Sequence, residues 1–225
     1  FGGIPFGGEA TQGMERFPYN TLNAENPGIS GFGDLYQNIN QMNLFISRTL
    51  HTDVLTESAR NYYLGQVYGL RAYYMYQLYR SWGDVVFTEE PSLGFEVGKL
   101  AKAATPAAEI FEQVKKDIES SLSYFGSDYT IKEKKSLWSK AATLMLKADV
   151  YLWSAHRDGG EGDARTAKNA LVDIQNNISR SNLDLMDTYQ GVFAYDNKGN
   201  KEIIFTIHNE LFEYNLWNGN NDLFP

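Results

Sequence analysis

The chain has 225 residues, of which 43% are hydrophobic, so it is long enough to fold around a substantial core. Its formal net charge of -8 and the lack of a long basic run argue against a surface that follows nucleic-acid phosphates. It contains no cysteine, which excludes disulfides and thiolate sites within these residues, and no apolar run approaches the ~20 residues that cross a bilayer.

Residues 1–30 are predicted to form a loop region. They contain repeated glycines, prolines at positions 5 and 18, and the asparagine-rich stretch YNTLNAENPG, without a sustained helical or strand period. Paired helices are predicted over 31–182. Apolar residues at steps of three or four predict the first of these helices from Gly31 to Leu50.

A second helix is predicted through the stretch NYYLGQVYGLRAYYMYQLYRSWGDVVF at 61–87, which holds seven of the fifteen tyrosines. Thr56 is expected to cap it, and Gly83 is expected to end it. The tyrosines point to all sides of such a helix, whereas a sugar platform needs one or two rings exposed side by side. We therefore expect them to pack between helices, each burying about 150 to 250 Å². Arg71 is expected to be buried and paired with Asp149.

Further helices are predicted downstream. The Thr-Pro pair at 105–106 is expected to begin one that ends near Gly126. Ser136 is expected to open another, whose alanines allow a neighbouring helix to approach closely. After the acidic stretch DGGEGD at 158–163, Asp163 is expected to begin the last long helix.

The stretch DGGEGD places three carboxylates among glycines, which are ligands that calcium could use. It lacks the EF-hand spacing and the terminal glutamate of that motif. We therefore predict a flexible turn between helices, with no metal site and no cofactor in the chain.

The C-terminal part changes character. The β-prone runs GVFAY and KEIIFTIH lie on either side of DNKGN, a pattern that predicts a β-hairpin over 189–208. The predicted fold class is therefore mainly α: tetratricopeptide-like stacked helix pairs with long loops and a short β-hairpin near the C-terminal end.

Four segments in order resemble the SusD/RagB family of outer-membrane nutrient-binding lipoproteins. They are LYQNINQMN at 35–43, LRAYYMYQLYRSWGDVV at 70–86, LMLKADVYLWSA at 144–155 and YQGVFAYDNKGNKEIIF at 189–205. Val86 stands where the family usually has proline, and Asp149 where arginine is common; both positions are in scaffold segments. The resemblance implies one SusD-like domain over 1–225 that is incomplete at its C-terminus.

The resemblance also implies a function and a location. Such a protein binds a nutrient, most often an oligosaccharide, at the cell surface and acts as a hinged lid over a SusC-like TonB-dependent transporter in the outer membrane. A lipid on an N-terminal cysteine would anchor it, although that cysteine is not in this sequence. Alternatives are a peptide-binding lid of the same family and a helical-repeat scaffold that binds only proteins.

Sugar recognition needs ring faces for the apolar side of a pyranose and amides or carboxylates for its hydroxyls. Two predicted loops combine these residue types. The candidate ligand-binding residues are Phe17, Tyr19, Asn20 and Asn23 in the first loop, and Tyr214, Trp217 and Asn218 in FEYNLWNGNND. Ordinary turn residues remain the alternative reading for each of them.

No catalytic residue is predicted. The three histidines have no zinc-site spacing, and the chain contains no nucleophile elbow, P-loop or dinucleotide fingerprint. Glu89 and Glu90 are adjacent in sequence, a placement that rarely sets two glycosidase carboxylates across a scissile bond. The chain is therefore expected to bind its ligand without chemistry.

Overall fold

The computed structural model describes residues 23, 32–94, 101–132 and 135–207. The chain divides into two units, residues 34–207 and a second unit made of residues 1–33 and 208–225. Of the second unit only Asn23, Phe32 and Gly33 belong to the described residues, so the fold below is that of the first.

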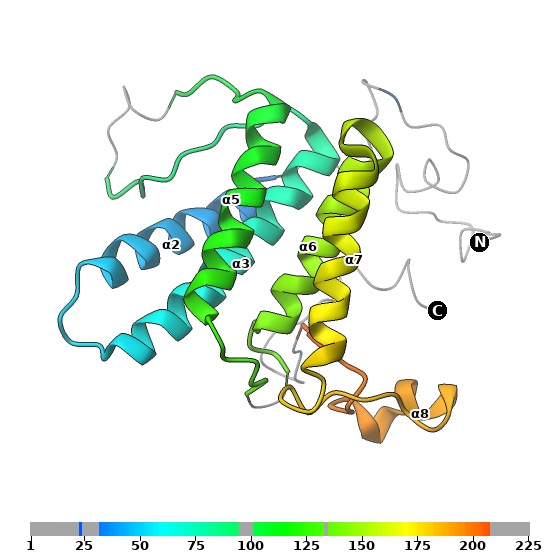
Figure 1. The fold of residues 1–225 in the computed structure, drawn as a ribbon. Helices are drawn as coiled ribbons and strands as arrows, with labels where there is room; N and C mark the ends of the chain where they lie inside the picture. The colour runs from blue at the N-terminus through cyan, green and yellow to red at the C-terminus, as the bar shows by residue number, and fades with distance from the viewer. Residues whose placement is uncertain (1–22, 24–31, 95–100, 133–134, 208–225) are drawn as a thin grey trace, which may run out of the picture. The chain divides into compact units, whose positions relative to one another are not determined.

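The first unit is mainly helical, as predicted (Figure 1). Its helices are α2 (Gly33–Leu50), α3 (Glu57–Trp82), α5 (Ala107–Phe125), α6 (Lys140–Ser154), the π-helix η1 (Ala155–Gly159), α7 (Gly160–Asn176), α8 (Tyr189–Phe193) and the 3-10 helix η2 (Tyr195–Asn197). α3 packs chiefly on α5 and α6 chiefly on α7, while α5 and α6 join the two pairs.

Both ends of α3 lie where local signals in the sequence place them. The Thr56 hydroxyl accepts a hydrogen bond of 3.3 Å from Ala59 N, which confirms the predicted N-cap. Gly83 ends the helix with φ of 72°, a backbone conformation that favours glycine.

The tyrosines of α3 build the core, as predicted. Tyr76 is fully buried and meets Trp153 of α6 edge to face at 6.4 Å between ring centres. Tyr79 contacts Phe111 of α5 at 4.9 Å. Aromatic pairs of this kind add to the stability that the buried area itself provides. Among the seven tyrosines, Tyr63 is the exposed one.

The start of α5 differs from the prediction, because no side chain of the Thr-Pro pair at 105–106 caps it. Asp84, just after α3, accepts a hydrogen bond of 2.8 Å from Ala107 N instead. α5 then runs antiparallel to α3, since the Ser121 hydroxyl near its end donates to Gly65 O near the beginning of α3 at 2.6 Å. The predicted end near Gly126 is confirmed.

Two predictions around α6 and α7 are wrong. Ser139, not Ser136, caps α6, and its side chain accepts a hydrogen bond of 3.3 Å from Ala142 N. The stretch at 158–163 belongs to η1 and to the first turn of α7, so it is not a loop that precedes a helix start at Asp163. The helical turns of α6 continue into η1, and the chain reverses at Gly160, whose φ is 55°.

Small residues let α6 and α7 approach closely, as predicted for the alanines of α6. Ala141 and Ala148 of α6 lie in one buried cluster with Ala167 and Ala170 of α7. A larger cluster joins α2, α3, α5 and α6 around Tyr76. The core of the unit therefore has two parts, one on each side of α6.

The β-hairpin predicted over 189–208 is not found in the described residues of that segment. α8 and η2 occupy its first half, and residues 201–207 contain no strand. The physical reason is local capping: the Thr188 hydroxyl accepts from Gly191 N at 3.1 Å, and Asn197 Nδ2 donates to Gly191 O at 2.9 Å. Side chains that bond the nearby backbone in this way compete with strand pairing.

Across the described ranges, the one β-bridge joins Val85 and Thr105. Within the same ranges, no helix combines the length and the apolar character that a membrane crossing requires.

Candidate ligand-binding surface

Six of the seven predicted ligand-binding residues lie outside the described residues: Phe17, Tyr19, Asn20, Tyr214, Trp217 and Asn218. Asn23 is described and its side chain is exposed. The assignment of a ligand to these two loops therefore stays a prediction. Since only Asn23 is described, no two of the predicted residues can be compared in position. Other surfaces can be judged from the geometry of residues 34–207.

Three aromatic side chains stand out on that unit, and we call Tyr189, Phe193 and Tyr195 the aromatic platform. Their side chains are 76%, 69% and 85% exposed. The rings of Tyr189 and Phe193 lie 5.0 Å apart between centres with 54° between their planes. The Lys198 ammonium lies 4.2 Å from the centre of the Tyr195 ring. Large rings that are exposed together commonly mark a site of interaction.

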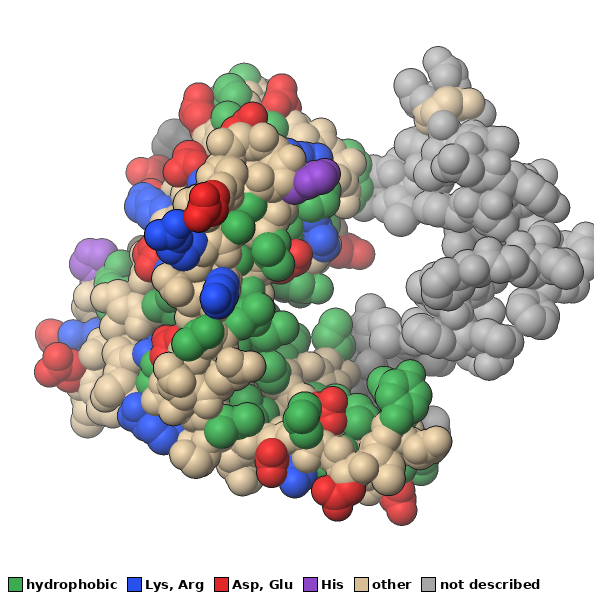
Figure 2. All heavy atoms as spheres, turned by 45° about the vertical axis from the view of Figure 1, so that its right-hand side comes forward, with side chains coloured by type: hydrophobic (Ala, Val, Ile, Leu, Met, Phe, Trp, Pro, Cys, Tyr) green, Lys and Arg blue, Asp and Glu red, His purple; other side chains and the backbone are tan. Residues whose placement is uncertain are grey.

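The surface around α8 is mixed in character. Figure 1 places α8 at the lower edge of the molecule, and Figure 2 shows hydrophobic side chains along that edge with acidic side chains between them. Apolar faces beside carboxylates are the combination that a polyhydroxyl ligand with an apolar side requires.

A buried asparagine holds the platform segment in place. Asn200 is only 6% exposed, and its Nδ2 donates to Val192 O at 2.9 Å and to Asn197 O at 2.8 Å. Its Oδ1 accepts from Glu202 N at 3.0 Å. All three polar groups of the amide therefore bond the backbone of this segment, which fixes the short helix although few apolar contacts support it.

Sequence reasoning missed the platform because it assigned Tyr189, Phe193 and Tyr195 to a hairpin, where alternate side chains would face inward. The available signal was three aromatic residues within 189–195 next to Asp196 and Asn197. Asparagine and aspartate at such spacing favour local turns and caps over strands.

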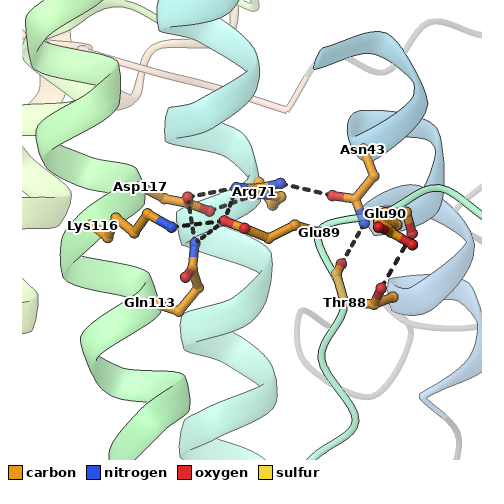
Figure 3. A network of polar contacts seen from close by, with 8 residues as sticks. All are labelled: Asn43, Arg71, Thr88, Glu89, Glu90, Gln113, Lys116 and Asp117. Carbon is orange, nitrogen blue, oxygen red and sulfur yellow. Dashed lines mark hydrogen bonds and ion pairs between the residues drawn. The ribbon is translucent and has the colours of Figure 1, made fainter. Parts of the chain in front are cut away.

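A second feature is the polar network around Arg71 in the middle of α3 (Figure 3). Its Nε and Nη2 donate to the two carboxylate oxygens of Asp117 on α5, each at 2.7 Å. Nη1 donates to Asn43 Oδ1 on α2 at 2.8 Å. Arg71 is 2% exposed and Asp117 is fully buried, so the pair lies inside the core. The prediction that Arg71 is buried and paired is confirmed.

The predicted partner of Arg71 was wrong. Asp149 is exposed on α6 and lies 3.8 Å from Arg80, about two and a half turns beyond Arg71 along α3. The reason is the orientation of α3: its Arg71 side faces α2 and α5, whereas its Arg80 end reaches α6. Burial raises the pKa of the Asp117 carboxyl, against the opposing effect of the hydrogen bonds from Arg71.

The network also holds the segment that follows α3. Asn43 Nδ2 donates to Thr88 O at 2.6 Å, and the Tyr36 hydroxyl donates to Val86 O at 2.8 Å. Glu89 in this segment is half exposed and accepts from Lys116 Nζ at 3.0 Å. The hydrogen bond from Lys116 lowers the pKa of Glu89. The buried side chains of this network, Asn43, Arg71 and Asp117, thus connect α2, α3, α5 and the segment after α3, which indicates a structural role.

The surface of the described unit also carries grooves. One, of about 290 Å³, lies over the end of α6 and is lined by Asp149, Leu152, Trp153, His156 and Arg157. The other, of about 370 Å³, lies on α5 and is lined by Ala108, Glu109, Glu112, Gln113 and Lys116. In the first groove the Arg157 guanidinium lies 4.0 Å from the centre of the Trp153 ring, and the second groove has no aromatic lining residue.

Metal ligands are not gathered anywhere in the described part of the chain. No group of three or more histidine, aspartate or glutamate side chains there could hold a metal ion. The stretch at 158–163 carries its carboxylates on η1 and α7, where Arg165 pairs with Glu161 at 2.7 Å.

The packed helix pairs define a class of protein, a stacked-helix scaffold. The particular family follows from comparison with known proteins. The profile of the SusD-like family described as "Starch-binding associating with outer membrane" matches residues 17–152. The chain belongs to this family.

Relatives and solved structures agree with that assignment. SusD-like protein P25 of Formosa agariphila is 26% identical over 174 residues, which are 77% of this chain and 31% of the relative. The structure of NanU from B. fragilis matches with a TM-score of 0.85 and 52% identity. A SusD superfamily protein from Bacteroides vulgatus matches with a TM-score of 0.83 and 48% identity.

The two structural matches cover nearly all of this chain but less than half of each matched chain. The two structures match 96% of this chain, and this is 42% of the NanU chain and 43% of the B. vulgatus chain. The shared fold alone therefore does not assign the ligands or partners of these whole proteins to this chain.

Proposed function

We propose that this chain belongs to a cell-surface nutrient-binding protein that captures an oligosaccharide and delivers it to a SusC-like TonB-dependent transporter of the outer membrane. The observation that carries this proposal is the family match over residues 17–152, whose description names starch binding and association with the outer membrane. A lipid anchor would hold the protein at the surface. The protein would bind and release its ligand without any chemical step.

The geometry supports a binding role. Buried side chains such as Arg71 and Asp117 fasten helices to one another. The exposed aromatic rings suit the apolar face of a sugar. Phe17, Tyr19, Asn20, Asn23, Tyr214, Trp217 and Asn218 remain the proposed contacts in the two loops.

A binding screen tests the proposal. The whole protein is titrated by calorimetry with a set of polysaccharides and with a peptide mixture, beside the variants Tyr19→Ala and Trp217→Ala. Saturable binding to one glycan class, weakened in either variant, is the expected result. Tyr63→Ala serves as the matched control, because Tyr63 is a partly exposed tyrosine on α3 and is distant from both loops in the sequence.

Two other results would redirect the assignment. Binding to peptides without binding to any glycan would make the protein a peptide-binding lid of the same family. Binding to neither, together with retention of a protein partner, would make it a helical-repeat scaffold. Delivery itself is tested by co-purification of a TonB-dependent transporter from outer membranes, and its repeated absence would contradict that part of the proposal.

A further inference from the structure

We draw no further inference here: the strongest candidate, the groove over the end of α6 lined by Asp149, Trp153, His156 and Arg157, carries none, because the chain spans 42% of the NanU chain that it matches and nothing in the structure shows what covers the groove.

Discussion

Arg71 on α3 and Asp117 on α5 form a two-point hydrogen-bonded ion pair at 2.7 Å inside the core of the first unit. The two residues are 46 positions apart, and the pair joins the two helices that pack most extensively on each other. Asn43 extends the connection to α2. The pair therefore sets the relative position of three helices.

Removal of one partner should be strongly destabilising. Arg71→Leu leaves the Asp117 carboxylate buried without its cation, so the free energy of unfolding should fall by about 3 to 5 kcal/mol. Urea unfolding followed by circular dichroism measures this. A double variant, Arg71→Leu with Asp117→Leu, should lose less than the single variant. Arg165→Ala is the control, since Arg165 belongs to an exposed pair, and its midpoint should not move. A small effect of Arg71→Leu would show that the pair does not stabilise the core.

Position 69 on α3 should accept only glycine, because the Trp138 side chain packs directly against the backbone there. A Cβ at Gly69 would overlap the indole nitrogen of Trp138 and lie 2.9 Å from Thr143 Oγ1. Gly69→Ala should therefore destabilise the protein by about 1 to 3 kcal/mol. Gly162→Ala is the matched control, because no atom lies near its added Cβ in α7, and it should raise stability by about 0.5 kcal/mol. Thermal unfolding of both variants measures the contrast, and equal effects would refute the packing explanation.

The free energy of unfolding should fall as the pH is lowered, in part because Glu89 becomes protonated. Its folded-state pKa is below the ordinary value of 4.5, chiefly because of the hydrogen bond from Lys116. A carboxyl with a lowered pKa contributes stability that is fully present above its unfolded-state pKa and is lost as the pH falls through the folded-state pKa. We expect Glu89→Gln to be less stable than the wild type near pH 6, and the difference to shrink as the pH falls below about 4.5. Unfolding measured from pH 6 to pH 3 gives the comparison, and a difference that does not depend on pH would contradict the assignment.

The local stability of residues 186–202 should depend on the Asn200 side chain. Asn200→Ala removes three hydrogen bonds to the backbone and leaves their partners unsatisfied, at a cost of about 1 to 3 kcal/mol. Hydrogen exchange should quicken in residues 186–202 and remain slow in α3 and α5, because the network is local. Asn176→Ala, at an exposed position of α7, provides the control. Uniformly faster exchange across all helices would show that Asn200 supports the whole core instead.

The boundaries of α3, which depend on local contacts, were predicted correctly, whereas the start of α5, which depends on a contact between distant residues, was not. Thr56 and Gly83 delimit α3 through contacts within one helical turn, so the sequence alone locates both ends. At the start of α5 the same reasoning failed, because the cap comes from Asp84, 23 positions before Ala107. The hairpin prediction failed because Asn197 and Asn200 bond the local backbone, an effect that β-propensity does not include.

The sequence by itself determined the helical class, the core role of the tyrosines around Tyr76 and the resemblance to the family, because helical periods, caps and motifs are local patterns. Only the tertiary structure decided that Arg71 pairs with Asp117 and not with Asp149, since the partner of a buried charge is set by which helix faces it. It also decided that Tyr189, Phe193 and Tyr195 are exposed. The same residue type is buried in α3 and exposed at α8 because burial depends on the elements that pack against a side chain, and these come from distant parts of the chain.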